Sequence, residues 1–173
     1  MVNRIAITGP ESTGKSQLTQ ELAAYYNTVF VPEYARKYLG LINRAYEEKD
    51  ILKIAQGQLQ LETSLIASAR NFIFCDTDFL VTTIWSEVKY GRCHPWIQNK
   101  LVNHRYNLYL LCNIDLPWEE DPMREHPHKR DFLFEKYLTY LKKMQFPFAV
   151  VSGKGKERLK NAAYYIDHAF LNV

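Results

Sequence analysis

Eight consecutive residues near the start of the chain have the types and spacing that hold a phosphate group. They match the pattern Gly-x-x-x-x-Gly-Lys-Ser/Thr and read Gly9, Pro10, Glu11, Ser12, Thr13, Gly14, Lys15 and Ser16. In this pattern, backbone N–H groups surround a phosphate at the start of a helix, where unsatisfied donors and the helix dipole both favour an anion. We expect the Lys15 ammonium to reach the β- and γ-phosphates of ATP and the Ser16 hydroxyl to hold Mg²⁺. The predicted ATP contacts are Gly9, Glu11, Ser12, Thr13, Gly14, Lys15, Ser16 and Gln17.

The segments on both sides of this run are those that a phosphate-binding loop requires. Residues 2–8 contain a short run of branched apolar side chains, which predicts a buried strand, and residues 14–27 carry apolar side chains at helical spacing. Strand, glycine loop and helix therefore follow one another in the required order. The alternative, a glycine-rich turn that starts a helix beside an exposed lysine, does not account for this order.

A carboxylate follows the second predicted strand. Residues 28–31 predict a short strand that ends at Pro32, because proline cannot donate to a sheet. Glu33 comes next, where ligands bind in open α/β sheets, so it is a candidate general base or substrate ligand. The alternative is an acidic residue in the first turn of a helix, stabilised by the helix dipole.

Two aspartates follow the most strand-like run of the chain, residues 71–75. An apolar strand that ends at Asp76 has the form of a Walker B element, whose carboxylate holds Mg²⁺ directly or through water. Asp78 is a second candidate, for substrate binding. Aspartates also cap helices, so Asp78 or Thr77 could instead be the N-cap of the next helix.

Residues 114–131 contain three prolines and alternating charges, which predict a mobile lid rather than part of the core. Arg124 and Arg130 are spaced so that a closing lid could deliver one or both to the transferring phosphate. Guanidinium suits this role because its fork of donors matches phosphate oxygens and it stays charged. The alternative is a solvated, charged loop.

Aromatic side chains after Asp76 could stack on a flat ring. Trp85 and Tyr90 lie in a helix expected over residues 79–91, and Trp96 follows it. The alternative for each aromatic is a place in the core. For His94, which precedes a proline, it is a structural role.

The expected elements alternate between strands and helices. Further strands are expected over residues 106–112 and 147–151, and further helices over 33–38, 47–70, 132–143 and 156–170. The order predicts an α/β fold of the P-loop NTPase class, with a mostly parallel five-stranded sheet, helices on both faces and an Arg-bearing lid.

Composition limits the class of protein. The 173 residues suit one domain, 1–173, and no apolar stretch approaches the ~20 residues of a membrane span. The chain enters a strand at once, so no signal peptide is expected. A net charge of +3 gives no case for nucleic-acid binding. Three cysteines without C-x-x-C spacing predict reduced thiols in a cytoplasmic protein, and small molecules are its expected partners. The oligomeric state is not predicted.

Several motifs together resemble the ribosylnicotinamide kinase domain of NadR proteins. The GTPase signature Asn-Lys-x-Asp is absent, because Asn99-Lys100 continues as Leu-Val. The resemblance is carried by the phosphate loop and by four further segments: 32–36 (Pro-Glu-Tyr-Ala-Arg), 76–79 (Asp-Thr-Asp-Phe), 90–95 (Tyr-Gly-Arg-Cys-His-Pro), and 115–118 with Asp121 and Arg124. The chain contains no His-x-Gly-His motif, so the adenylyltransferase half of those proteins is not expected in it.

The resemblance implies transfer of the ATP γ-phosphate to the 5′-hydroxyl of nicotinamide riboside. It implies that Glu33 or Asp78 contacts the ribose, that Glu33 or Asp76 accepts the hydroxyl proton, and that an aromatic ring such as Trp85 or Tyr90 stacks on the cationic nicotinamide. The implied substrate contacts are Glu33, Tyr34, Arg36, Asp78, Trp85, Tyr90 and His94. The alternatives are a kinase for another nucleoside and a non-catalytic, ATP-binding regulatory module.

Overall fold

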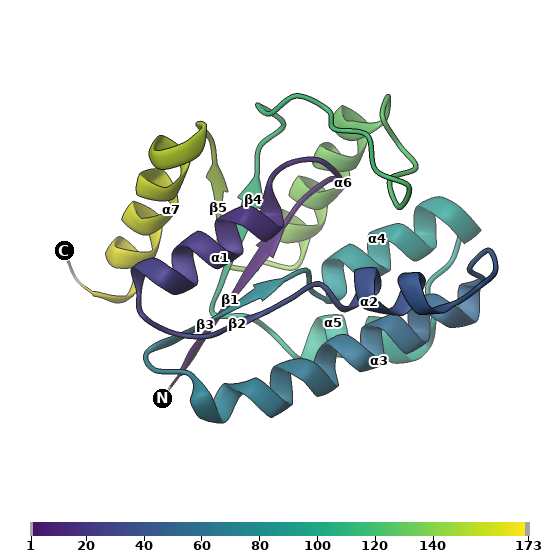
Figure 1. Cartoon of the computed structure of the whole chain (residues 1–173), viewed down its shortest axis with the longest axis horizontal. Coiled ribbons are helices and arrows are strands. Elements are labelled where there is room, and N and C mark those ends of the chain that lie inside the picture. Colours follow the sequence, from purple (N-terminus) through teal and green to yellow (C-terminus); the bar gives the residue numbers. More distant parts are fainter. Residues whose placement is uncertain (1, 172–173) are drawn as a thin grey trace.

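The structure is a computed structural model that describes residues 2–171. These residues form a five-stranded sheet between two layers of helices (Figure 1). The sheet has the order β2-β3-β1-β4-β5, and all neighbouring strands are parallel. Its strands are β1 (Asn3–Thr8), β2 (Phe30–Val31), β3 (Phe72–Asp76), β4 (Leu108–Cys112) and β5 (Phe148–Val151). The α/β fold with a parallel five-stranded sheet is therefore confirmed.

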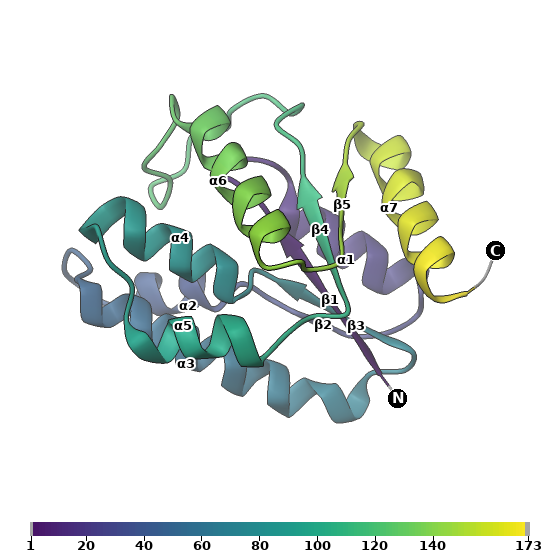
Figure 2. The ribbon, with the colours of Figure 1, turned by 180° about the vertical axis from the view of Figure 1, so that it is seen from behind.

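Helices cover both faces of the sheet (Figures 1 and 2). On one face lie α1 (Lys15–Tyr25) and α7 (Gly155–Phe170); on the other lie α3 (Glu48–Leu65), α4 (Phe79–Tyr90), α5 (Pro95–Asn103) and α6 (Arg130–Lys143). The short helix α2 (Tyr34–Leu41) precedes α3, and a 3₁₀ turn, Ile66–Ser68, follows it. None of the helices described here is long and apolar enough to cross a membrane.

The core has two parts because successive side chains of a strand point to opposite faces. In β1, Ile5 and Ile7 pack with Leu18 and Leu22 of α1, whereas Ala6 packs on the other side of the sheet. A strand covered on both faces reads as a continuous apolar run, and this made β1, β3 and β4 recognisable in the sequence.

Helix α5 was not predicted from the sequence. His94 is its N-cap, and His94 Nδ1 accepts the backbone N–H of Trp96 at 3.1 Å. Pro95 occupies the first helical position, where its missing N–H costs nothing and its fixed φ suits the helix. A proline directly after a capping residue was therefore the signal in the sequence that could have predicted this helix. His94 has a structural role as its N-cap, which was the alternative interpretation.

Candidate nucleotide-binding and catalytic site

The phosphate loop lies between β1 and α1, and its backbone conformation requires glycine at both ends. Gly9 and Gly14 have φ values of 132° and 73°. A Cβ atom on Gly9 would lie 3.1 Å from the Cys112 carbonyl oxygen, and one on Gly14 would lie 2.8 Å from Leu116 Cδ1. Both glycines adopt the positive φ values that the loop needs. They also let the loop pass close to Cys112 at the end of β4 and to Leu116 in the segment that follows.

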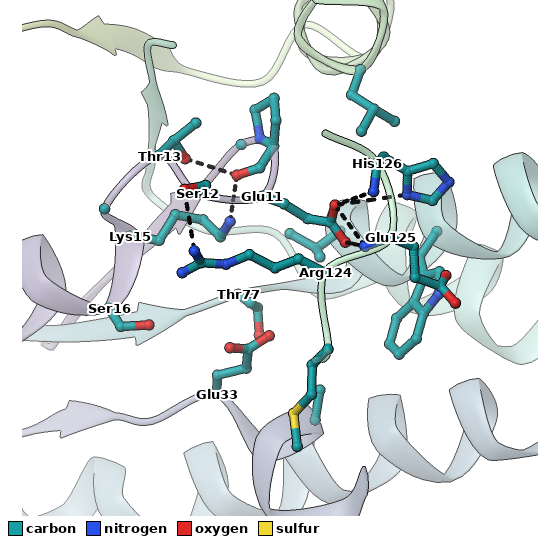
Figure 3. A pocket seen from close by; sticks show the side chains of 18 of the residues that line it. Glu11, Ser12, Thr13, Lys15, Ser16, Glu33, Thr77, Arg124, Glu125 and His126 are labelled. Atoms are coloured by element: carbon teal, nitrogen blue, oxygen red, sulfur yellow. Dashed lines mark hydrogen bonds and ion pairs between the residues drawn. The ribbon is translucent and has the colours of Figure 1, made fainter. Parts of the chain in front are cut away.

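Side chains of the loop turn inward onto a single carbonyl (Figure 3). The Pro10 carbonyl accepts a hydrogen bond from Lys15 Nζ at 2.7 Å and one from Thr13 Oγ1 at 2.8 Å. Lys15 is thus held beside the loop that it is expected to serve. A phosphate in the loop would offer this ammonium a charged partner in place of a neutral carbonyl.

A cavity of about 390 Å³ opens beside the phosphate loop. Its walls come from the loop, the start of α2, the helices α4 and α6, and the segment after β4. The lining includes Gly9 to Gln17, and also Glu33, Trp85, Arg124 and Tyr137. The structure therefore brings the predicted ATP contacts, one predicted base, one predicted ring contact and one predicted lid arginine to the same space.

Asp76 and Ser16 lie together in a smaller adjacent cavity of about 330 Å³, which Glu33 also lines. Asp76 is only 3% exposed, and within the described chain its Oδ1 atom has no hydrogen-bond partner. Burial raises the pKa of Asp76 to about 6, and the negative charge of Glu33 acts in the same direction. A buried carboxylate oxygen without a partner beside a hydroxyl suits a hard cation such as Mg²⁺.

Glu33 stands between these two cavities and lines both. Its carboxylate lies 3.2 Å from Arg36 Nε, and this ion pair within the first turn of α2 orients the carboxylate. In Figure 3, Glu33 lies beside Thr77, across from Lys15 and Arg124. The carboxylate therefore faces the space into which the phosphate loop opens.

Asp78 serves as the N-cap of α4, which was its alternative interpretation. Its Oδ1 accepts the backbone N–H groups of Leu80 at 2.5 Å and Val81 at 3.2 Å. Asp78 is 3% exposed and lines neither of the two cavities described above, and burial raises its pKa to about 6. Its predicted contact with a substrate stays a prediction.

Both predicted lid arginines contact the phosphate loop. Arg124 Nη1 donates to Ser12 Oγ at 3.2 Å, and Arg130 Nη1 donates to the Ser12 carbonyl at 3.2 Å. The centre of the Trp118 ring lies 5.9 Å from Arg124 Cζ and 5.8 Å from Arg130 Cζ. The two guanidinium groups thus share one aromatic ring while they reach the residue in the middle of the loop.

Acidic side chains hold the same segment over the cavity. Glu125 accepts hydrogen bonds from Tyr46 Oη and Lys89 Nζ, both at 2.6 Å. Asp121 accepts one from Arg36 at 2.8 Å. The partners in these contacts are separated by between 36 and 85 positions in the chain, so no local pattern in the sequence predicts the contacts.

Some of the remaining predicted residues line one of the two cavities, and others line neither. Gln17 lines the larger cavity, and Tyr34 and Arg36 line the smaller one. Trp85 lines the larger cavity while its Nε1 donates to Tyr46 Oη at 2.9 Å. Tyr90, at the end of α4, and His94 line neither cavity, and their predicted substrate contacts stay predictions.

A parallel sheet with a glycine-rich loop between its first strand and helix, a lysine at the helix start and a buried aspartate at the end of β3 defines a P-loop nucleotide-binding protein. The chain belongs to the AAA domain family, whose model matches residues 4–158.

Curated relatives carry the name "Trifunctional NAD biosynthesis/regulator protein NadR". The Salmonella typhimurium and Escherichia coli proteins are each 36% identical over 127 residues. The match covers 71% of this chain but 31% of either relative, so the chain spans about a third of their length.

Solved structures share the fold at lower identity. A NadR protein in complex with NR matches with a TM-score of 0.80 at 19% identity and covers 97% of this chain and 50% of that one. A deoxyadenosine kinase from M. mycoides matches with a TM-score of 0.60 at 16% identity and covers 95% and 99% of the two chains.

Proposed function

We propose that the protein transfers the γ-phosphate of ATP to the 5′-hydroxyl of nicotinamide riboside and so forms nicotinamide mononucleotide. The observation that carries this proposal is the shared cavity, in which the phosphate loop and Arg124 face Glu33 and Trp85. The 36% identity to NadR proteins, whose name includes NAD biosynthesis, supports the choice of acceptor, as does the NadR structure that contains NR.

Ser16 and Asp76 would hold Mg²⁺, because the hydroxyl and the unpartnered carboxylate oxygen fit the oxygen ligands that this ion prefers. The ion would neutralise charge that develops on the phosphate oxygens. Lys15 would leave the Pro10 carbonyl and bind the β- and γ-phosphates, and the N–H groups of the loop would bind the remaining oxygens.

Glu33 would accept the hydrogen bond of the acceptor hydroxyl and take its proton. Of the two candidate carboxylates, Glu33 lines the larger cavity, whereas Asp76 lines the smaller cavity beside Ser16. Arg124 would stabilise charge on the transferring group, because its guanidinium already lies at Ser12. Residues 114–131 would act as the lid of a single kinase domain formed by residues 1–173.

Trp85 would provide the surface for the nicotinamide ring. Its Nε1 is held by Tyr46 Oη at 2.9 Å, which fixes the orientation of the indole. A cationic ring on an aromatic face gains about 0.5–2 kcal/mol, and uncharged nucleosides lack this gain.

The buried cysteines Cys75, Cys93 and Cys112 form no disulfide, which supports the proposal that the protein works in the cytoplasm.

The first test is phosphate transfer from Mg·ATP to nicotinamide riboside, beside thymidine, cytidine, deoxyadenosine and a reaction without acceptor, with products identified by mass. We expect selective formation of the mononucleotide. Lys15→Ala should abolish transfer, and Lys160→Ala, which changes an exposed lysine on α7, should leave it unchanged. Transfer to another nucleoside instead would retain the kinase and reject the acceptor; ATP binding without transfer would favour a regulatory module.

Two conservative variants separate the carboxylates. Glu33→Gln should lower kcat and leave the Mg²⁺ dependence unchanged, whereas Asp76→Asn should raise the Mg²⁺ concentration needed for half-maximal rate. The opposite pattern would assign the proton transfer to Asp76.

A further inference from the structure

A buried arginine on α7 lies behind the phosphate loop. Arg158 is 4% exposed, and its guanidinium bonds three backbone carbonyls from three separate segments. Its Nη2 donates to the Thr13 carbonyl at 2.7 Å and to the Asn113 carbonyl at 3.3 Å, and its Nη1 donates to the Gly153 carbonyl at 3.0 Å. One side chain therefore joins the phosphate loop to the ends of β4 and β5.

The charge of this arginine is balanced by one carboxylate, that of Asp115, which lies 2.6 Å from Nη1. The other oxygen of Asp115 accepts the backbone N–H of Gly153, also at 2.6 Å. Arg158 and Asp115 thus fix the Gly153 peptide segment from both its donor and its acceptor side. Burying the Arg158 guanidinium costs desolvation energy, which its hydrogen bonds and the partly buried Asp115 carboxylate offset.

The bond to Thr13 determines the direction of a phosphate donor. In a trans peptide the carbonyl and the following N–H point in opposite directions, and residues 2–171 contain no cis peptide. Because the Thr13 carbonyl points back to Arg158, the Gly14 N–H points away from Arg158. Gly14 lines the larger cavity, so we infer that this N–H is the donor that Arg158 presents to a bound phosphate.

We propose that Arg158 is a positioning residue for ATP: it presets the Gly14 donor and joins the phosphate loop to the turn after β5. Arg158 lines neither cavity, so it acts on ATP through the backbone that it holds. Glu33 and Trp85 belong to α2 and α4 regions that Arg158 does not bond, so the acceptor side stays independent of it. The inference rests on the proposed ATP site but not on the identity of the acceptor.

The test measures the equilibrium binding of Mg·ATP and of inorganic tripolyphosphate to Arg158→Met and Arg158→Lys by calorimetry. For Arg158→Met we expect both dissociation constants to rise about tenfold or more, since a charged hydrogen bond that orders the loop is lost. Arg158→Lys keeps the charge but loses the forked donors, so we expect its dissociation constants to lie between those of the wild type and of Arg158→Met. The KM for nicotinamide riboside at saturating ATP should stay within about twofold of wild type.

The control is Arg4→Met, which removes an arginine that pairs with the buried carboxylate of Glu62 at 3.1 Å. Arg4 lies at the opposite end of β1, so its loss should lower the Tm without changing either dissociation constant. Asp115→Asn provides a second, milder variant if Arg158→Met does not fold, and it should also weaken Mg·ATP binding.

Unchanged binding of Mg·ATP in folded Arg158→Lys and Asp115→Asn would overturn the proposal, as would an equal loss of binding in Arg4→Met. Failure of the wild type to phosphorylate nicotinamide riboside would reject the acceptor instead, because the binding measurements do not involve it.

Discussion

The Glu11 carboxylate, in the phosphate loop, accepts the backbone N–H of His126 at 3.0 Å, and it accepts that of Glu125 from the same segment. A negative side chain in a loop that binds triphosphate would repel its ligand if it faced the anion. Here its charge is directed to two N–H donors of residues 114–131 instead (Figure 3). The phosphate loop and the proposed lid are therefore bonded directly through Glu11.

Replacing Glu11 should open this segment. In Glu11→Ala both N–H groups lose their acceptor, so we expect faster tryptic cleavage after Arg124, Lys129 and Arg130. Glu11→Gln keeps an acceptor oxygen and should be cleaved at an intermediate rate. Limited proteolysis followed by mass spectrometry measures this, with Glu135→Ala on the exposed surface of α6 as the control. Equal cleavage of all four proteins would show that Glu11 does not hold the segment.

Arg124 should act on the rate rather than on ATP affinity. Its guanidinium lies at Ser12 and lines the cavity, where it can stabilise charge that develops during transfer. For Arg124→Ala we expect kcat to fall by about two orders of magnitude or more, with the KM for ATP changed by less than about fivefold. Arg70→Ala, shortly before β3 and therefore at the end of the strands away from the phosphate loop, should leave both values unchanged. A raised KM with an unchanged kcat would assign Arg124 to ground-state binding.

The sequence predicted those parts of the site that depend on residues close together in the chain. The phosphate loop was recognisable because its turn, its donors and its helix start occupy eight consecutive residues. Asp76 was recognisable because it ends an apolar run. Arg158 and Glu125 were not, because each acts through partners that only the fold brings near: Arg158 Nη2 bonds Thr13, 145 positions away.

Gly57 shows the same limit inside a helix. From the sequence a helix was expected over residues 47–70, with Gly57 as a weak point inside it. In the structure the Tyr34 ring lies against it, and a Cβ atom on Gly57 would lie 2.1 Å from Tyr34 Cε1. A glycine in a helix can therefore mark the place of a ring from another element.

Gly57→Ala should consequently destabilise the protein, although alanine is normally better than glycine in a helix by about 1 kcal/mol. Displacing the Tyr34 ring should cost more than this gain, so we expect a net loss of about 1 kcal/mol in the free energy of unfolding. The double variant Tyr34→Ala/Gly57→Ala should be more stable than Tyr34→Ala, because the alanine then meets no ring. Urea denaturation of the four proteins of this cycle measures the coupling, and additive effects would contradict the contact.

Asp50, at the start of α3, should make stability depend on pH in acid. Its buried carboxylate accepts hydrogen bonds from Arg44 at 2.7 and 2.8 Å, from Tyr38 Oη at 2.7 Å and from the Glu47 N–H at 2.8 Å. The Arg44 guanidinium holds the pKa of Asp50 well below its usual range, against the opposing effect of burial. Because the pKa is lower in the folded state, the stabilisation is fully present above the unfolded value of about 3.9 and is lost as the pH falls toward the folded value.

The prediction compares wild type with Asp50→Asn across pH. The amide has one acceptor oxygen and no charge for the Arg44 fork, so we expect its Tm to be lower by roughly 5–10 °C at pH 7. This difference should stay constant from about pH 8 to 5 and shrink below about pH 4, where the wild-type carboxylate in the unfolded chain becomes protonated. Glu48→Gln changes a neighbouring carboxylate whose partner, Arg92, is largely exposed, and it should alter the Tm little at any pH. A difference between wild type and Asp50→Asn that persists unchanged to pH 3 would mean that the charge of Asp50 contributes nothing, and that the loss comes from shape alone.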